Sequence, residues 1–204
     1  MPHDGPTPQP ATPRTRAPRR AILALAIAAV SSSCTHPWTV VQRTEPNRLV
    51  GQGAFVLDRV SFDGLRIDLH RSLPEDEYLA TKTPSQRIEW QFEKANLEAH
   101  LFDAVRTHGT GMRFVQPTSP LAQAAFIVHT HVTLIEPGSY FRDPECHLDV
   151  TISDSHDAPV EHLELRVAPS MGVVYPISTK LERMGDLLGE SLARYLRMRV
   201  EGRG

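Results

Sequence analysis

The sequence predicts an α+β fold, a two-layer sandwich in which two long amphipathic helices pack on one face of a mostly antiparallel, mixed sheet of about five to six strands. Two patterns predict it. Short runs of alternating apolar and polar residues occur in consecutive pairs, as antiparallel strands do. Two longer segments carry apolar residues three and four positions apart, as helices packed on a core do. The expected order is β-β-α-β-β-β-β-α.

The first pair of strands is expected on either side of Asp63-Gly64, where FVLDRVSF precedes the dipeptide and LRIDLH follows it. Asp-Gly tolerates the positive φ angles of a type I′ turn, and Leu65, Ile67 and Leu69 alternate as one buried face requires. The pattern therefore predicts a β-hairpin. Residues 71–82 follow as an acidic, solvated loop.

The first long helix is predicted from Pro84 onward. Thr83 can cap its N-terminus, Pro84 fits the first helical position, and Gln86 completes a capping box. Gly109 or Gly111 is expected to end it. The face expected to pack on the sheet carries apolar residues at helical spacing, namely Ile88, Phe92, Ala95, Ala99 and Phe102, joined by Leu101 and Val105.

The strongest strand pattern is AAFIVHTHVTLIEPG, residues 124–138. A short strand, MRFVQ, and one helical turn at Ser119-Pro120 are expected before it. Alternation divides the side chains of the long strand between two faces. One face carries Phe126, Val128, Val132 and Leu134, and the other carries Ile127, His129, His131, Thr133 and Ile135.

The chain ends in a further strand pair and a second long helix. The strands CHLDVTIS and EHLELRV flank the turn DSHDAP. Ser178 or Thr179, with Glu182 after them, is expected to cap the helix. Its apolar stripe consists of Leu181, Met184, Leu188, Leu192, Tyr195 and Leu196.

The N-terminal part predicts export. Six prolines lie in the first 18 residues, which favours disorder, and Arg14, Arg16, Arg19 and Arg20 precede ten apolar residues, Ala21 to Val30. A basic region followed by a short apolar run is typical of a secretory signal, and ten apolar residues are too few to span a bilayer, which takes about 20. We therefore expect residues 1–33 to be a basic n-region with an export signal.

The sequence Ser31-Ser32-Ser33-Cys34 resembles the lipobox of bacterial lipoproteins, in which the cysteine is acylated and becomes the mature N-terminus. We expect acylation of Cys34, residues 34–53 as a tether, a single α+β domain over 54–200, and a tail over 201–204. Thr35 follows the cysteine in place of aspartate, and by its resemblance to the sorting signals of bacterial lipoproteins this implies the outer membrane. If Cys34 is not acylated, a disulfide with Cys146 becomes possible.

The charge balance makes nucleic acid a poor partner. Without residues 1–33 the chain has 18 basic and 23 acidic residues. Proteins that bind DNA or RNA need basic surface to displace counterions. The sequence also lacks a phosphate-binding loop, H-E-x-x-H and C-x-x-C, so no cofactor or metal is expected from motifs.

His129 and His131 are the most suggestive pair, because side chains two positions apart on a strand share a face and can present two nitrogens to one metal. Such a site would need a third ligand, for example Cys146, His147 or Glu136. The favoured reading is that the pair belongs to an exposed or partner-facing side of the sheet.

Ser155-His156-Asp157 contains the residues of a catalytic triad, but triad members normally come from distant parts of a chain. No G-x-S-x-G accompanies them, so they are interpreted as turn residues. The sequence predicts no catalytic residue.

The strand that ends Ile135-Glu136-Pro137-Gly138 and the helix Thr179–Leu196 together resemble a family of bacterial outer-membrane lipoproteins. The helix shows an early Glu-Arg pair and a late Tyr-Leu, as in that family, and Ala125 stands where the family has an acidic residue. The layout is similar to that of small envelope-assembly lipoproteins and of the N-terminal domain of the Tol-system propeller protein. The resemblance implies a protein that is not an enzyme.

Together these features predict a lipid-anchored envelope protein that acts as a binding or assembly module on the periplasmic side of the outer membrane, with an envelope protein as partner. The alternative is a soluble periplasmic protein that binds a metal or another ligand through His129 and His131.

Overall fold

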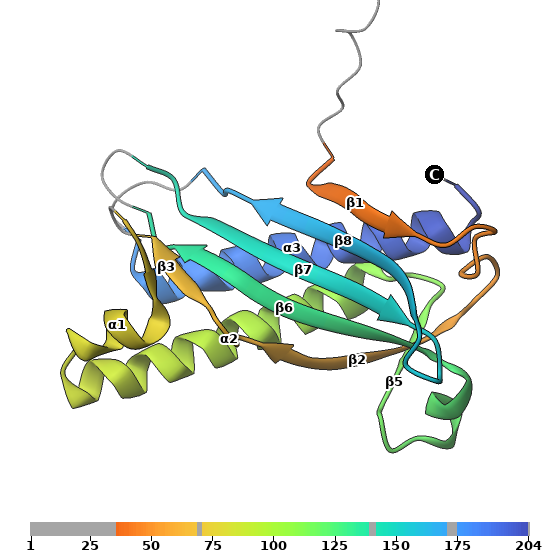
Figure 1. Ribbon diagram of the computed structural model, residues 1–204, viewed down its shortest axis with the longest axis horizontal. Coiled ribbons are helices and arrows are strands. Elements are labelled where there is room, and N and C mark those ends of the chain that lie inside the picture. Colours follow the sequence, from red (N-terminus) through yellow and green to blue (C-terminus); the bar gives the residue numbers. More distant parts are fainter. Residues whose placement is uncertain (1–35, 69–70, 139–141, 171–174, 204) are drawn as a thin grey trace, which may run out of the picture. The chain divides into compact units, whose positions relative to one another are not determined.

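The computed structural model describes residues 36–68, 71–138, 142–170 and 175–203, and these belong to one compact unit, His36–Gly204. A single sheet forms one layer and two long helices form the other (Figure 1). The predicted two-layer α+β sandwich is confirmed, but the sheet has eight strands rather than five or six. The predicted export signal and Cys34 lie outside the described residues.

The long strand β6 is the centre of the sheet, which runs in the order β1-β8-β7-β6-β2-β5. The antiparallel half consists of β6 (Phe126–Glu136), β7 (Glu145–Ser153), β8 (Pro159–Val167) and β1 (Trp38–Arg43). On the other side of β6, β2 (Ala54–Ser61) pairs parallel with β6, and β5 (Arg113–Val115) pairs parallel with β2. The sheet is therefore mixed.

The predicted hairpin across Asp63-Gly64 is wrong. A turn does form, with the Leu65 amide donating to the Phe62 carbonyl over 3.1 Å and Gly64 at φ +68°. However, β2 and the short strand β3 (Arg66–Asp68) both pair parallel with β6 and not with each other. The 11 residues of β6 have room for both partners in succession, so the turn shifts the chain along β6 instead of reversing it.

Residues 71–82 are more regular than the expected loop. Ser72–Pro74 forms β4, which pairs antiparallel with β3, and Glu75–Ala80 forms the short helix α1. Three carboxylates, Glu75, Asp76 and Glu77, occupy the first turn of α1. Negative charge at that end is favourable because the helix dipole is positive there.

The segment 34–53, expected as a tether, is part of the fold from His36 onward. Trp38–Arg43 forms the edge strand β1 on β8, and the Trp38 ring packs edge-on against Tyr195 with 5.8 Å between ring centroids. Leu49 is fully buried. The tether prediction fails because these few apolar side chains complete the core.

Helix α2 (Pro84–His108) begins with the predicted capping box, in which Thr83 and Gln86 bond each other's backbone amides. Its expected core face is largely wrong. Ile88 and Phe92 are 60% and 67% exposed, whereas the buried residues are Trp90, Leu97, Leu101, Ala104 and Val105. The helix carries apolar stripes on two opposite sides, and the stripe chosen from the sequence faces solvent.

Helix α3 (Ile177–Val200) buries every residue of its predicted stripe. It begins two or three residues earlier than expected, with Pro176 as the N-cap and no side-chain cap, so the predicted cap at Ser178 or Thr179 is wrong. Gly185 and Gly189 lie against α2. A Cβ at Gly185 would lie 2.7 Å from the Leu97 carbonyl oxygen, so glycine permits this close contact between the helices.

The alternation of β6 holds up to a bulge between Val132 and Leu134. The bulge shifts the register by one residue, so Ile135 is fully buried and Leu134 takes the more open position. The faces predicted for these two residues are therefore exchanged. The predicted helical turn is present as the 3-10 helix Pro120–Ala124, with Ser119 as its N-cap.

Candidate functional site

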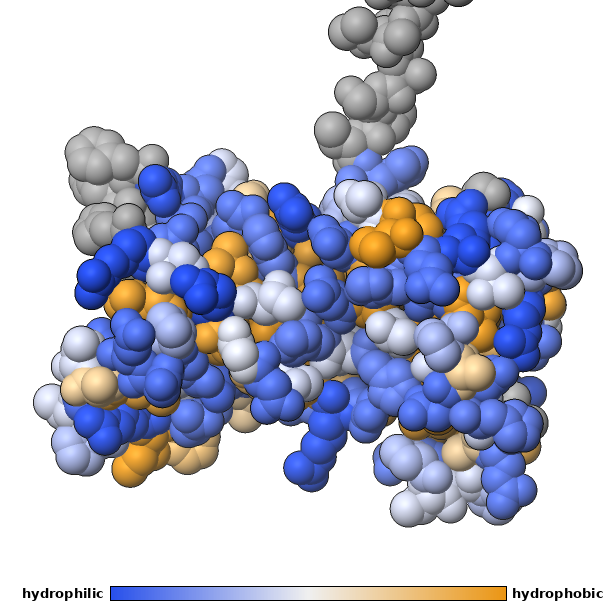
Figure 2. Space-filling view, in the orientation of Figure 1, coloured by the Kyte–Doolittle hydropathy of each residue, from blue (hydrophilic) through white to orange (hydrophobic). Residues whose placement is uncertain are grey.

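The face of the sheet opposite the helices is polar. Alternation on β6 points His129 and His131 to this open face, between the buried side chains of Val128, Thr130 and Val132. Figure 2 views the molecule with the sheet in front of the helices, and hydrophilic residues cover most of the visible surface, with hydrophobic ones scattered among them. The structure thus gives the two histidines the shared face that the sequence predicts.

Neighbouring strands add polar groups to the same place. In the strand register His129 lies opposite Thr151, which lies opposite His162, and His131 lies opposite Asp149. A hollow of about 400 Å³ opens there. Its lining is Asp58, Arg59, Ser61, Asp63, His129, Thr130, His131, Asp149, Thr151 and His162. We call this hollow the open-face site.

His129 is the best-connected side chain of the open-face site. Its Nδ1 lies 3.1 Å from Asp58 Oδ2 on β2, and its Nε2 lies 3.1 Å from Asp157 Oδ1 in the β7–β8 turn. Only a protonated imidazole can donate to both carboxylates at once. His131 Nε2 lies 2.6 Å from the Asp63 carbonyl oxygen. The two histidines therefore bind different neighbours.

The residues named as third metal ligands do not converge on this pair. Cys146 is fully buried on the helix-facing side, where burial raises the pKa of its thiol. His147 Nε2 contacts Glu145 Oε1 at 2.6 Å, and Glu136 Oε1 lies 3.4 Å from an Arg142 nitrogen. Within the described ranges, no three His, Cys, Asp or Glu side chains are grouped so that they could hold a metal.

Sequence reasoning missed Asp58, Asp157 and His162 as members of the open-face site. Asp58 lies beside a register shift in β2, and Asp157 has φ 62° in a turn, so neither follows a simple strand pattern. His162 could have been found, because it alternates with the buried Leu163 and Leu165 on β8.

Ser155-His156-Asp157 forms a turn. Asp154 Oδ1 accepts from the amides of His156 and Ala158, at 3.0 and 3.1 Å. Ser155 Oγ lies 3.4 Å from His156 Nδ1, while Asp157 contacts His129 instead of His156. The serine, histidine and aspartate therefore do not form the hydrogen-bonded chain of a catalytic triad, which agrees with the turn interpretation.

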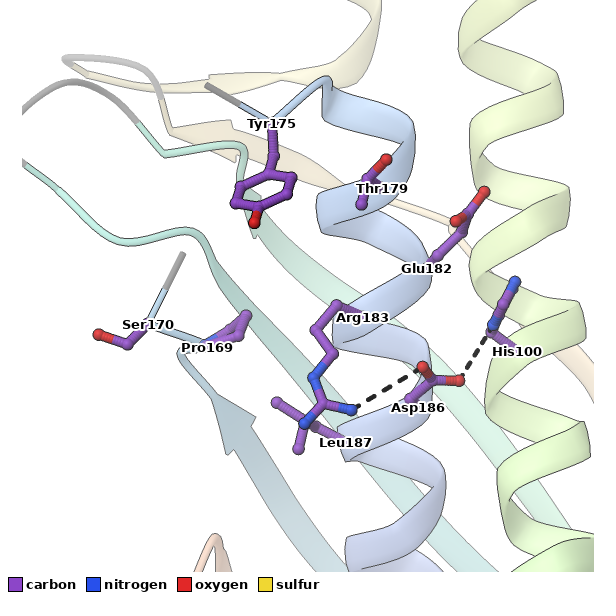
Figure 3. Close-up of a pocket in the computed structure, with 9 residues that line it drawn as sticks. All are labelled: His100, Pro169, Ser170, Tyr175, Thr179, Glu182, Arg183, Asp186 and Leu187. Atoms are coloured by element: carbon purple, nitrogen blue, oxygen red, sulfur yellow. Dashed lines mark hydrogen bonds and ion pairs between the residues drawn. The ribbon is translucent and has the colours of Figure 1, made fainter. Parts of the chain in front are cut away.

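A second cavity, of about 660 Å³, lies along the N-terminal half of α3 (Figure 3). Asp186 lies between two basic side chains, 3.0 Å from His100 Nδ1 on α2 and 4.0 Å from a nitrogen of Arg183 on α3. All three side chains are about half exposed. The groove offers hydrogen bonds and both signs of charge, and sequence reasoning did not find it.

Comparisons with known proteins do not assign the chain to a family. No family model matches it, and no curated protein does. Among solved structures it is similar to PelC from Paraburkholderia phytofirmans, crystallised as a dodecamer, at 13% identity and a TM-score of 0.36, over 76% of this chain and 97% of PelC. A protein described as uncharacterized matches at 12% identity and a TM-score of 0.41, over 74% and 95% of the two chains.

A third solved structure, a putative neuraminyllactose-binding hemagglutinin homolog from Helicobacter pylori, matches at 9% identity and a TM-score of 0.25, over 78% of this chain and 90% of that one. TM-scores this low support no inference about the present chain. In the described part of the chain, no helix has the length and apolar character needed to cross a membrane.

Proposed function

We propose that the protein is a non-enzymatic, lipid-anchored cell-envelope protein, held by acylated Cys34 on the periplasmic side of the outer membrane, where it acts as a binding or assembly module. The proposal begins from the sequence of the N-terminal part: four arginines, a short apolar run and a cysteine after three serines. This arrangement resembles that of a lipoprotein signal.

The observation that carries the proposal is the short distance along the chain between Cys34 and the folded unit. The unit begins at His36, and β1 begins at Trp38, four residues after the cysteine. At about 3.5 Å per residue, four residues reach at most about 14 Å. An acyl anchor on Cys34 would therefore hold the β1 edge of the sheet close to the bilayer.

Strand β1 is well suited to bear such an anchor. It pairs with β8 along its length, and Trp38 packs against Tyr195 of α3 and stacks on His36 with 4.6 Å between ring centroids. A force on the anchor would therefore be transmitted to the sheet through β8 and to the helix layer through Tyr195.

A binding role fits the open-face site better than a catalytic one. The site presents donors and acceptors from four neighbouring strands, β2, β6, β7 and β8, on the sheet face opposite the two long helices. The envelope partner we propose would dock on this face through hydrogen bonds and charge.

The test is fractionation of cells of a bacterium with an outer membrane that produces the full chain. The wild type should be found in the outer membrane, and Cys34→Ala should release it. Cys146→Ala is the matched control, because that buried thiol has no part in anchoring. A soluble wild type, or a Cys34→Ala variant that stays in the membrane, refutes the proposal.

The second candidate is a soluble periplasmic ligand-binding protein that uses the hollow around His129 and His131. The observation in its favour is the size of the hollow, about 400 Å³, with histidines on two strands. A wild type recovered from the periplasm without membrane would favour this candidate.

A further inference from the structure

Helix α2 carries an unpartnered apolar stripe on the side opposite its buried face. The stripe, called the α2 seam below, consists of Ile88, Phe92, Ala95, Ala99 and Phe102. Ile88 and Phe92 are 60% and 67% exposed and the two alanines are exposed, whereas Phe102, at the end of the stripe, is half-buried and packs against the core. A helix that packs one side on a core normally shows polar residues on the other side. Packing on the core therefore does not explain why these exposed positions are apolar.

The spacing within the seam is four, three, four and three residues. This is the a/d spacing of a heptad repeat, which keeps one narrow stripe in line for a second helix. The large residues stand toward the ends and the alanines in the middle, so a partner helix could approach closely at Ala95 and Ala99. The occupant that fits this shape is a helix.

Acidic residues occupy half of the positions that flank the seam. In the heptad frame Glu89 and Asp103 stand on one edge, and Glu98, which accepts a hydrogen bond from a backbone amide of β2, stands on the other. The nearby cations are already engaged: Lys94 lies 2.7 Å from Glu75, and Arg106 lies 3.3 Å from Asp103.

The charge of Glu89 also acts on its neighbour Glu93. Partial burial, and then the negative charge of Glu89, raise the pKa of Glu93. Within the described ranges Glu89 has no ion-pair partner, so its own negative charge is not neutralised, whereas Asp103 on the same edge is paired with Arg106.

A second copy of this chain is a poor occupant. In an antiparallel helix pair the flanking positions meet their own kind, so Glu98 would face Glu98 and Glu89 would face Asp103. In a parallel pair Glu98 would face Asp103. Like charges at these positions are unfavourable, and both orientations bring them together.

We propose that the α2 seam is a docking site for an amphipathic helix of another protein, one whose apolar stripe is flanked by lysine or arginine. The apolar stripe supplies contact area, and the acidic edges select a basic partner. The inference goes beyond the proposed envelope function and does not depend on the acylation of Cys34.

The test uses two synthetic amphipathic peptides of about three heptads, both with leucine at a and d. One carries lysine at the flanking positions and the other carries glutamate. Binding to the full chain is followed by fluorescence anisotropy. The lysine peptide should bind at least about tenfold more tightly than the glutamate peptide, and added salt should reduce the difference.

Phe92→Gln should weaken binding of the lysine peptide at least about tenfold, since it removes the largest exposed side chain of the seam without adding charge. Leu121→Gln is the matched control, because Leu121 is also exposed, at 54%, but lies in the 3-10 helix away from α2. Its affinity should equal that of the wild type. Circular dichroism checks that both variants fold.

Four results of the peptide and sedimentation experiments overturn the proposal. These are equal affinity for the two peptides, no binding of the lysine peptide, a Phe92→Gln affinity equal to that of the wild type, and a wild-type dimer in sedimentation that Phe92→Gln dissociates. The last would make a second copy the occupant. Binding to anionic vesicles that is lost in Phe92→Gln would assign the seam to a membrane surface and overturn it as well.

Discussion

Glu161 on β8 and Arg199 near the end of α3 form an ion pair inside the sandwich. The Arg199 Nη2–Glu161 Oε1 distance is 2.6 Å, and the two side chains are 0–2% exposed. Tyr195 donates its hydroxyl to the other carboxylate oxygen over 2.7 Å, and the burial of that hydroxyl and the bond to Glu161 raise its pKa. The contact fastens the C-terminal end of α3 to the sheet.

Glu161→Gln should destabilise the fold strongly, because it leaves the guanidinium of Arg199 buried without a counter-charge. We expect the free energy of unfolding to fall by about 3 kcal/mol or more. Urea unfolding followed by circular dichroism measures it. Glu190→Gln, on the helix that carries Arg199, is the matched control, since Glu190 pairs with Arg194 at the surface and should change stability by less than about 1 kcal/mol. Equal effects of the two substitutions would contradict the buried role of Glu161.

The contact between α2 and α3 depends on the absence of a side chain at Gly189. A Cβ there would meet the Leu101 carbonyl oxygen and the Ala104 Cβ at less than van der Waals distance. Gly189→Ala should therefore force the helices apart and cost about 1–3 kcal/mol of unfolding free energy.

Gly53→Ala is the control for this substitution, because a Cβ at Gly53 meets no atom within 4 Å. It should leave stability unchanged or raise it by about 0.4–1 kcal/mol. A thermal melt that places Gly189→Ala at or above the wild type would refute the close packing of the helices.

Asp154 should make the β7–β8 turn sensitive to pH. The amides of His156 and Ala158, followed by the guanidinium of Arg48, lower the pKa of this carboxyl in the folded protein. A lowered folded-state pKa gives stability that is complete above the ordinary aspartate pKa of about 3.9 and is lost as the pH falls through the lowered value.

Asp154→Asn should therefore lower the urea midpoint at neutral pH, and the difference from the wild type should shrink in acid below the ordinary aspartate pKa. Unfolding curves of both proteins across this range measure it. A difference that stays constant with pH would show that the charge of Asp154 has no part in the turn.

The two histidines of β6 should not bind zinc. Both nitrogens of His129 face carboxylates, and His131 Nε2 faces a backbone carbonyl oxygen, so the pair does not present two free nitrogens to one ion. Isothermal titration at micromolar zinc should show no saturable heat. Saturable heat that His129→Ala abolishes would favour the metal-binding alternative.

The fold class and most of the helices and strands follow from the sequence because they rest on local patterns. The capping box at Thr83 and the stripe on α3 are examples. The errors arise where one local sequence pattern is compatible with two structures. Helix α2 has two apolar stripes, and spacing alone does not say whether Phe92 or Leu97 faces the sheet.

Pairing between distant strands was harder still to predict. Asp63-Gly64 is a turn in both interpretations, but only the position of β6 decides that β2 and β3 pair with it rather than with each other. The same holds for the open-face site. His129 and His131 share a face by alternation, whereas Asp58 and Asp157 join them only through the tertiary fold.

The most direct test of the proposed lipid anchor is mass spectrometry of the N-terminus of the mature protein, purified from the membranes of a bacterium with an outer membrane. We expect a mature chain that begins at Cys34 and carries diacylglycerol on its sulfur. A mature chain that begins elsewhere, or an unmodified Cys34, would contradict it.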